Sequence, residues 1–144
     1  MSNVEQNTTS YPKVDVFSDG GSRGNPGKSA SGYVILTTDE TVLETGGEYL
    51  GIATNNQAEY QAVRLALEQA KKYSPLAVRF FIDSELVVKQ LNGEYKIKNN
   101  NLWPIYEAIK KLMKEFPSVT FTHVRREQNT LADKEVNRIL DDRI

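Results

Sequence analysis

A change in hydrophobic periodicity restricts what this chain can fold into. Up to residue 53, short runs alternate apolar with polar residues, and glycine-rich or acidic turns separate them, which is typical of β-strands. From Thr54 to Tyr73, apolar residues recur every three or four positions, which is typical of an amphipathic helix. The order predicts a strand meander followed by alternating helices and strands, and hence an α/β fold with a mixed sheet flanked by helices.

The expected elements follow in the order β-β-β-α-β-α-α-β-α. The strands are expected at 14–19, 32–37, 41–50, 77–83 and 118–124, and the helices at 54–73, 84–91, 102–116 and from Asn129 to about Leu140. Thr54 and Gln57 predict a capping box at the first helix, and Asn129 is interpreted as the cap of the last. Residues 20–27 hold four glycines and Pro26, and we interpret them as a turn-rich loop.

The composition limits the class of protein. A length of 144 residues favours one domain, and we expect a flexible N-terminal tail at 1–12 followed by a domain at 13–142. The absence of cysteine excludes a disulfide framework and a thiolate metal site, and it fits a cytoplasmic location. No apolar run approaches the ~18 residues of a membrane span, and the N-terminus has no secretory pattern, so no membrane partner is expected.

Charge is unevenly distributed along the sequence. The net charge of −1 argues against a protein that coats nucleic acid non-specifically. Residues 71–114, however, hold nine Lys or Arg against four acids, a local excess of +5. This basic segment suits a polyanionic substrate, although lysines on solvated helix faces would give the same count.

Four acidic residues carry the functional argument: Asp19, Glu59, Asp83 and Asp133. Each lies at the end of an expected strand or near the start of an expected helix, next to apolar residues that would be buried. An unpaired buried charge is costly, so acids in such places call for a reason. Individually, the three aspartates also fit a turn, a helix cap or a first-turn dipole contact.

If these acids converge, they form an all-oxygen site for hard divalent cations such as Mg²⁺. Hydrolysis of a phosphodiester needs an activated water and neutralisation of charge on the leaving oxygen, and two metal ions about 4 Å apart provide both. His123 is the only histidine, which excludes a His-rich zinc site. The pattern therefore indicates a metal-dependent enzyme that acts on phosphates.

The motifs around these acids resemble type 1 ribonuclease H. The resemblance covers residues 14–140 and rests on four segments: DGGSRGNPG at 19–27, TNNQAE at 54–59, IDS at 82–84 and REQNTLAD at 126–133. It implies a five-stranded mixed sheet whose second strand is antiparallel to the rest, flanked by helices. It also implies an Mg²⁺-dependent endonuclease, with Mn²⁺ as a possible substitute, that cuts the RNA strand of RNA–DNA hybrids and leaves 3′-hydroxyl and 5′-phosphate ends.

The resemblance assigns roles to individual residues. Asp19 would bridge two metal ions, and Glu59, Asp83 and Asp133 would complete their coordination. The residues implied in substrate binding are Gly20, Ser22, Arg23, Gly24, Asn25, Thr54, Asn55 and Glu85. Of these, Ser22, Asn25 and Glu85 would follow the minor-groove edge of the RNA strand together with Glu59, where the 2′-hydroxyl distinguishes RNA from DNA.

The sequence departs from the best-known family members at two places. Residues 92–101 are too short to form the basic protrusion that some members use to grip the hybrid, so the chain resembles the compact members. Many members also place a histidine before the last helix to assist turnover. The compact members that the chain resembles use an arginine in this segment, so Arg126 is the preferred assistant and Arg125 the second choice. His123 lies in an apolar strand run, where a structural histidine fits at least as well. Trp103 is expected in the helix core rather than as a base-stacking platform.

Two other functions compete with a ribonuclease H. A catalytically silent hybrid-binding module of the same fold would lack at least one metal ligand, and this chain keeps all four candidates. A DNA-processing nuclease or strand-transfer domain would have other ligand spacings and no loop like the one at 19–27. We therefore expect an active enzyme, and we expect it to act as a monomer.

Overall fold

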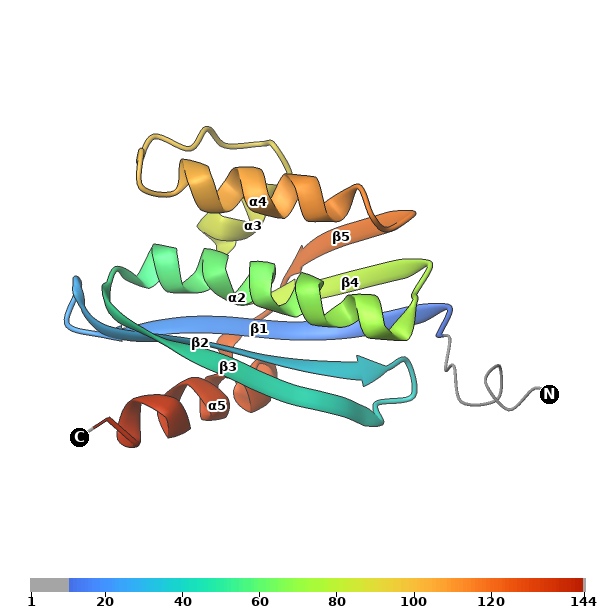
Figure 1. The fold of residues 1–144 in the computed structure, drawn as a ribbon, viewed down its shortest axis with the longest axis horizontal. Coiled ribbons are helices and arrows are strands. Elements are labelled where there is room, and N and C mark those ends of the chain that lie inside the picture. The colour runs from blue at the N-terminus through green and yellow to red at the C-terminus, as the bar shows by residue number, and fades with distance from the viewer. Residues whose placement is uncertain (1–10, 144) are drawn as a thin grey trace.

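The structure, a computed structural model, describes residues 11–143. The strands are β1 (Lys13–Arg23), β2 (Gly27–Thr37), β3 (Val42–Ala53), β4 (Ala77–Ile82) and β5 (Ser118–His123). The helices are α2 (Asn55–Ala70), α3 (Glu85–Leu91), α4 (Trp103–Met113) and α5 (Thr130–Asp141), with short 3₁₀ turns η1 (Lys71–Tyr73) and η2 (Arg126–Gln128). Figure 1 shows their arrangement. The expected order of strands and helices is confirmed.

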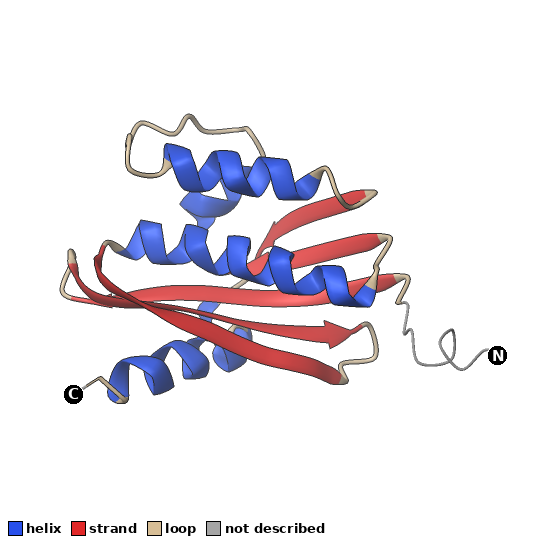
Figure 2. Cartoon of the chain, viewed as in Figure 1, coloured by secondary structure: helices blue, strands red, loops and turns tan. Residues whose placement is uncertain are grey.

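All five strands form one sheet in the order β3-β2-β1-β4-β5 (Figure 2). β2 is antiparallel to both β1 and β3, whereas β4 is parallel to β1 and β5 is parallel to β4. This is the five-stranded mixed sheet with an antiparallel second strand that the sequence predicts. Ser18 of β1 pairs with Ile82 at the end of β4, so Asp19 and Asp83, the next residue of each chain segment, lie next to one another.

The two faces of the sheet are covered by different helices (Figure 1). α2 and α4 cover one face, and the main core lies beneath them, with Val16, Leu67, Phe80 and Ile109 among its fully buried residues. α5 covers the other face through a smaller cluster of Ala30, Val136, Ile139 and Leu140. The site described below lies where α2 and α5 both approach the end of β1.

The helix signals of the sequence are largely confirmed. Thr54 and Gln57 form both hydrogen bonds of the predicted capping box. Asn129 precedes α5, but its side chain makes no capping bond, because its amide points to another partner. Trp103 is a second correction: it is 42% exposed on α4 rather than buried, because it begins the helix ahead of the inward-facing Ile105 and Ile109.

The glycine motif at 20–27 is a correction to the expected loop. Residues 20–23 continue β1 and pair with β2 from Ser31 back to Lys28, and the turn itself is confined to residues 24–26. Gly24 makes that turn with φ of 97°, a conformation that favours glycine. The glycines indicated a turn, but Gly20 allows α2 to pack closely against β1 and does not reverse the direction of the chain.

Part of the predicted tail, residues 1–10, lies outside the described residues. Tyr11 donates its backbone N–H to Tyr73, and the carbonyl of Pro12 accepts from Leu76 and Ala77. The boundary between a tail and a domain at 13–142 stays a prediction. Among residues 11–143, no helix is both long and apolar enough to span a membrane.

Candidate active site

The four acidic residues come from four elements that meet at one edge of the sheet. Asp19 lies in β1, and Asp83 directly follows β4, whose Ile82 pairs with Ser18 of β1. Glu59 lies in the second turn of α2, and Asp133 lies in the first turn of α5. The topology therefore explains why residues far apart in the sequence become neighbours.

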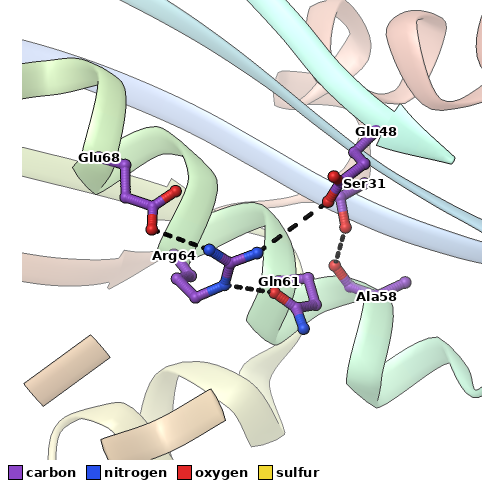
Figure 3. Close-up of polar contacts among 6 residues, drawn as sticks. All are labelled: Ser31, Glu48, Ala58, Gln61, Arg64 and Glu68. Atoms are coloured by element: carbon purple, nitrogen blue, oxygen red, sulfur yellow. Dashed lines mark hydrogen bonds and ion pairs between the residues drawn. The ribbon is translucent and has the colours of Figure 1, made fainter. Parts of the chain in front are cut away.

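Two contacts hold the start of α2 against the sheet. A side chain at residue 20 would collide with the backbone of Ala58, so glycine permits the close approach. Ser31 in β2 donates its hydroxyl to the carbonyl of Ala58 at 2.7 Å, as Figure 3 shows. Because Glu59 follows Ala58, both contacts fix the position of its carboxylate relative to β1.

Three of the acids form a tight cluster. Asp19, Glu59 and Asp83 each offer an oxygen that lies within 4.8 Å of the other two. Asp133 is not part of this tight group, but it lines the same cavity of about 480 Å³. The structure thus brings all four predicted acids to one site, with Asp133 on the α5 side of the cavity.

The cluster is electrostatically unfavourable as a set of bare carboxylates. Burial, together with the charges of Asp83 and Asp133, raises the pKa of Asp19 to about 8. Burial, Asp19 and Asp83 likewise raise the pKa of Glu59 well above its ordinary value. Burial also raises the pKa of Asp83, although the Asn129 side chain and the charge of Arg126 oppose that shift.

One carboxylate oxygen has no protein partner. Oε1 of Glu59 is buried and receives no hydrogen bond. A buried acceptor without a donor costs roughly 1–3 kcal/mol, and more when the group is charged. A divalent cation among these carboxylates would satisfy that oxygen and remove the repulsion between the acids, so the residues present fit a hard metal ion.

The chain is similar in sequence and in structure to known proteins. Residues 17–139 match the model of a family described as reverse transcriptase-like. A ribonuclease HI of Halobacterium salinarum is 39% identical over 130 residues, which is 90% of this chain and 65% of that protein. The crystal structure of ribonuclease H1 from the same archaeon gives a TM-score of 0.86 at 39% identity and covers 90% of this chain and 98% of that one.

The chain belongs to the type 1 ribonuclease H family. A bifunctional protein of Mycobacterium tuberculosis is 38% identical over 130 residues, which is 90% of this chain but only 36% of that protein. The chain thus spans about a third of the length of that relative. The structure of LC11 ribonuclease H1, in complex with an RNA/DNA hybrid, gives a TM-score of 0.83 at 36% identity over 87% of this chain and 94% of that one.

The residues predicted to bind a ribonuclease H substrate divide into two groups. Those that line the acidic cavity are Gly20, Ser22, Arg23 and Asn55. Those outside its lining are Gly24, Asn25, Thr54 and Glu85. Asn25 is nevertheless tied to the cavity wall, because its side chain accepts the backbone N–H of Asn55 at 3.1 Å.

Three residues were candidates for assisting turnover. Arg126 lines the cavity and lies near enough to Asp83 for its charge to lower the pKa of that acid. His123 is exposed at the end of β5, and Arg125 is exposed just before η2; neither lines the cavity. The geometry favours Arg126.

Sequence reasoning missed the part that Asn129 plays in the site. Its side chain is fully buried and donates from Nδ2 to the carbonyl of Ser18 at 2.9 Å, which ties the start of α5 to the residue before Asp19. Its Oδ1 is buried without a donor. Asn137, also missed, lines the cavity and donates to Oδ2 of Asp133 at 3.3 Å. The four-residue spacing of Asp133 and Asn137 on one helix was the available signal.

Proposed function

We propose that this chain is an endonuclease that hydrolyses the RNA strand of RNA–DNA hybrids with two divalent metal ions. The observation that carries the proposal is the convergence of Asp19, Glu59 and Asp83, with an orphaned Glu59 oxygen among them. Family membership, and a hybrid-bound relative at 36% identity, support the choice of substrate.

The acidic residues would hold the ions, and Mg²⁺ is the proposed metal, with Mn²⁺ as a substitute. Asp19 would be shared between both ions, and Glu59, Asp83 and Asp133 would each contribute to one or the other. When bound, the ions would activate a water and neutralise charge on the leaving 3′ oxygen, which leaves 3′-hydroxyl and 5′-phosphate ends. Because metal ligands must be deprotonated, metal binding should release protons from Asp19 and Glu59.

The walls of the cavity would orient the hybrid. Gly20 lines the cavity and would present its backbone to the substrate, while the space of its missing side chain is taken by the backbone of α2. Ser22 and Asn25 would face the RNA sugars, where the 2′-hydroxyl marks RNA, with Arg23 beside them. On the other side, Thr54 and Asn55 would lie near the adjoining strand, and Glu85 would extend the contact to the RNA.

Arg126 would assist turnover near the scissile phosphate. Replacement by alanine should lower kcat by about 10- to 150-fold, since a lost hydrogen bond to a charged group is worth about 1.5–3 kcal/mol. Mg²⁺ binding should be retained. Steady-state kinetics on Arg126→Ala, Arg125→Ala and His123→Ala separate the candidates, and a slower His123→Ala enzyme would overturn this assignment.

The alternative is a silent hybrid-binding module of the same fold. The retained acids at all four positions favour catalysis. The deciding assay incubates an end-labelled RNA–DNA hybrid with the protein, with Mg²⁺ or with EDTA, beside duplex DNA and duplex RNA. The proposal requires metal-dependent cuts in the RNA of the hybrid alone, with rates that fall as salt rises. Binding of the hybrid without any cut would support the silent module instead.

The proposal extends to the context of the reaction. We place the active unit at residues 13–142, since the secondary structure runs from Lys13 to Asp141. We place the reaction in the cytoplasm and assign it to a monomer, because the four acids of one chain come together without a second copy. Size-exclusion chromatography at the assay concentration tests the monomer.

A further inference from the structure

The outer face of α4 carries an aromatic and basic groove. Trp103 is 42% exposed and meets Tyr106 edge-on, with ring centroids 5.5 Å apart. The ammonium of Lys110 lies 5.4 Å from the Tyr106 ring. With Lys111 and Lys114, these side chains line a cavity of about 590 Å³. The groove therefore offers aromatic ring surface and positive charge side by side.

A second cavity lies between this groove and the active site along the chain. Asn55 lines the acidic cavity, and its neighbour Asn56 lines the second cavity, of about 540 Å³. Leu102 also lines the second cavity, and the next residue, Trp103, lines the groove on α4. Residues adjacent in the sequence thus connect the linings of the three cavities, and the starts of α2 and α4 lie at the same end of the molecule in Figure 1.

The charge along this path is positive. Lys96 and Lys98 line the second cavity, and Lys110, Lys111 and Lys114 line the third. The acids of the two linings are Glu94 and Glu107, so five lysines against two acids give an excess of +3. Lysines that follow a path with interleaved aromatic rings are the means by which proteins bind single-stranded nucleic acid.

We propose that the α4 groove binds single-stranded nucleic acid, such as the unpaired extension of a hybrid held in the acidic site. A base would stack on Trp103, and the phosphates would contact Lys111 and Lys114. A duplex offers no free base face to Trp103, and an acidic peptide offers charge without flat rings, so the pairing of ring and lysines selects a single strand. That the single strand extends from a hybrid held in the acidic site rests on the proposed function. The binding of a single strand in the groove does not.

Trp103 is the only tryptophan of the chain, so its fluorescence reports on this groove. The experiment titrates the Asp19→Asn protein, without divalent metal, with an oligothymidylate. The expected result is saturable quenching that weakens with salt. The double variant Lys111→Ala/Lys114→Ala should bind roughly tenfold more weakly, with a salt slope about 1.4 less steep, since each phosphate contact to a single strand contributes about 0.7.

Lys13→Ala is the matched control, because Lys13 is an exposed lysine that lines none of the three cavities. It should leave the quenching unchanged. Equal affinity of the double variant and the control would overturn the proposal. Quenching by a polyglutamate peptide but not by oligothymidylate would also overturn it and would assign the groove to an acidic protein segment.

A second experiment separates this inference from the proposed function. Trp103→Ala, with a thermal melt to verify folding, is assayed on a short blunt hybrid and on the same hybrid with a single-stranded extension. Cleavage of the extended hybrid at sub-saturating concentration should fall roughly tenfold, and that of the blunt hybrid less than about twofold. Equal losses of cleavage on both hybrids would overturn the proposed role of the groove but not the proposed nuclease activity. No cleavage by the wild-type protein would overturn the nuclease and leave the quenching result standing.

Discussion

Glu44 and Glu59 are two acids whose carboxylates are largely withdrawn from solvent, and the fold treats them in opposite ways. Glu44 in β3 accepts the hydroxyls of Tyr33 at 2.7 Å and Tyr73 at 2.6 Å, and pairs with Lys72 at 2.6 Å. Burial alone would raise its pKa, but Lys72 and the two hydroxyls lower the pKa overall. Glu59 has other acids as neighbours and one oxygen without a donor, and its pKa is raised.

The difference separates structural charge from functional charge. Where a carboxylate serves the fold, the protein supplies its donors, as it does for Glu44. Where several carboxylates are held together and one of their buried oxygens has no donor, the native state stores unfavourable energy that a ligand can release. The acidic cluster is therefore built to bind a cation rather than to stabilise the apo protein.

The largest expected effect comes from Asp19→Asn. The change removes a metal ligand, so hybrid cleavage should fall by roughly 10³-fold or more, as expected from the several kcal/mol that a metal ion supplies. It also removes like-charge repulsion, so the metal-free variant should be at least as stable as the wild type. Single-turnover cleavage and thermal melts measure both, and turnover close to that of the wild type would refute the site.

Asn129→Ala tests a donor that the acidic cluster does receive. Loss of the amide frees the carbonyl of Ser18 and removes a side chain that lowers the pKa of Asp83. Partners of metal ligands are typically worth about 10–100-fold in metal affinity or activity, and we expect a loss in that range. The Mg²⁺ concentration for half-maximal rate should rise. An unchanged Mg²⁺ requirement would reduce Asn129 to a packing role.

Glu44→Ala should affect stability without affecting activity. It leaves two tyrosine hydroxyls without their acceptor and Lys72 without its partner, so we expect a loss of about 2 kcal/mol in the free energy of unfolding. Urea denaturation measures it. Glu48→Ala is the matched control: Glu48 is half-exposed and lies 4.0 Å from Arg64, which also pairs with Glu68 (Figure 3). It should cost less than about 0.5 kcal/mol. Equal losses of unfolding free energy in Glu44→Ala and Glu48→Ala would show that Glu44 has no special role in stability.

The two carboxylate environments should also respond to pH in opposite directions. The pKa of Asp19 is raised to about 8, so the folded apo protein binds more protons than the unfolded chain between about pH 4 and 8, and its stability falls as pH rises through that window. The pKa of Glu44 is lowered, so its contribution is present above the ordinary glutamate pKa and is lost on acidification.

Thermal melts in EDTA from pH 5 to 8 measure how far the stability of the apo protein falls as the pH rises. One group contributes at most about 1.4 kcal/mol per pH unit. The slope should be shallower in Asp19→Asn and unchanged in Glu44→Gln. A wild-type slope equal to that of Asp19→Asn would show that the cluster does not titrate as described.

The sequence was informative wherever a signal was local or repeated. The capping box of Thr54 and Gln57, the inward stripe of α2 and the alternation of the strands depend on neighbours along the chain, and the structure bears them out. Glu59 stood out because it lies in the periodic helix next to apolar residues that would be buried. The resemblance then supplied the number of strands and the antiparallel direction of the second strand, whereas the order of the strands in the sheet was not predicted.

Tertiary contacts explain what the sequence did not predict. The segment at 20–23 is a strand because β2 pairs with it, although its glycines indicate a turn. Asn129 looks like a helix cap, but its hydrogen-bond partner lies 111 residues away. Trp103 has a large aromatic side chain of the kind that is often buried, and only the packing of α4 leaves it at the surface.

The central claim is that Asp19, Glu59 and Asp83 form a cation site, and Mg²⁺-dependent stabilisation tests it most directly. The melting temperature of the wild-type protein should rise steadily with Mg²⁺ concentration, because an ion that binds only the folded state stabilises it by mass action. Glu59→Gln, which keeps the shape but removes the charge, should lose most of that rise. An equal rise in both proteins would contradict the account.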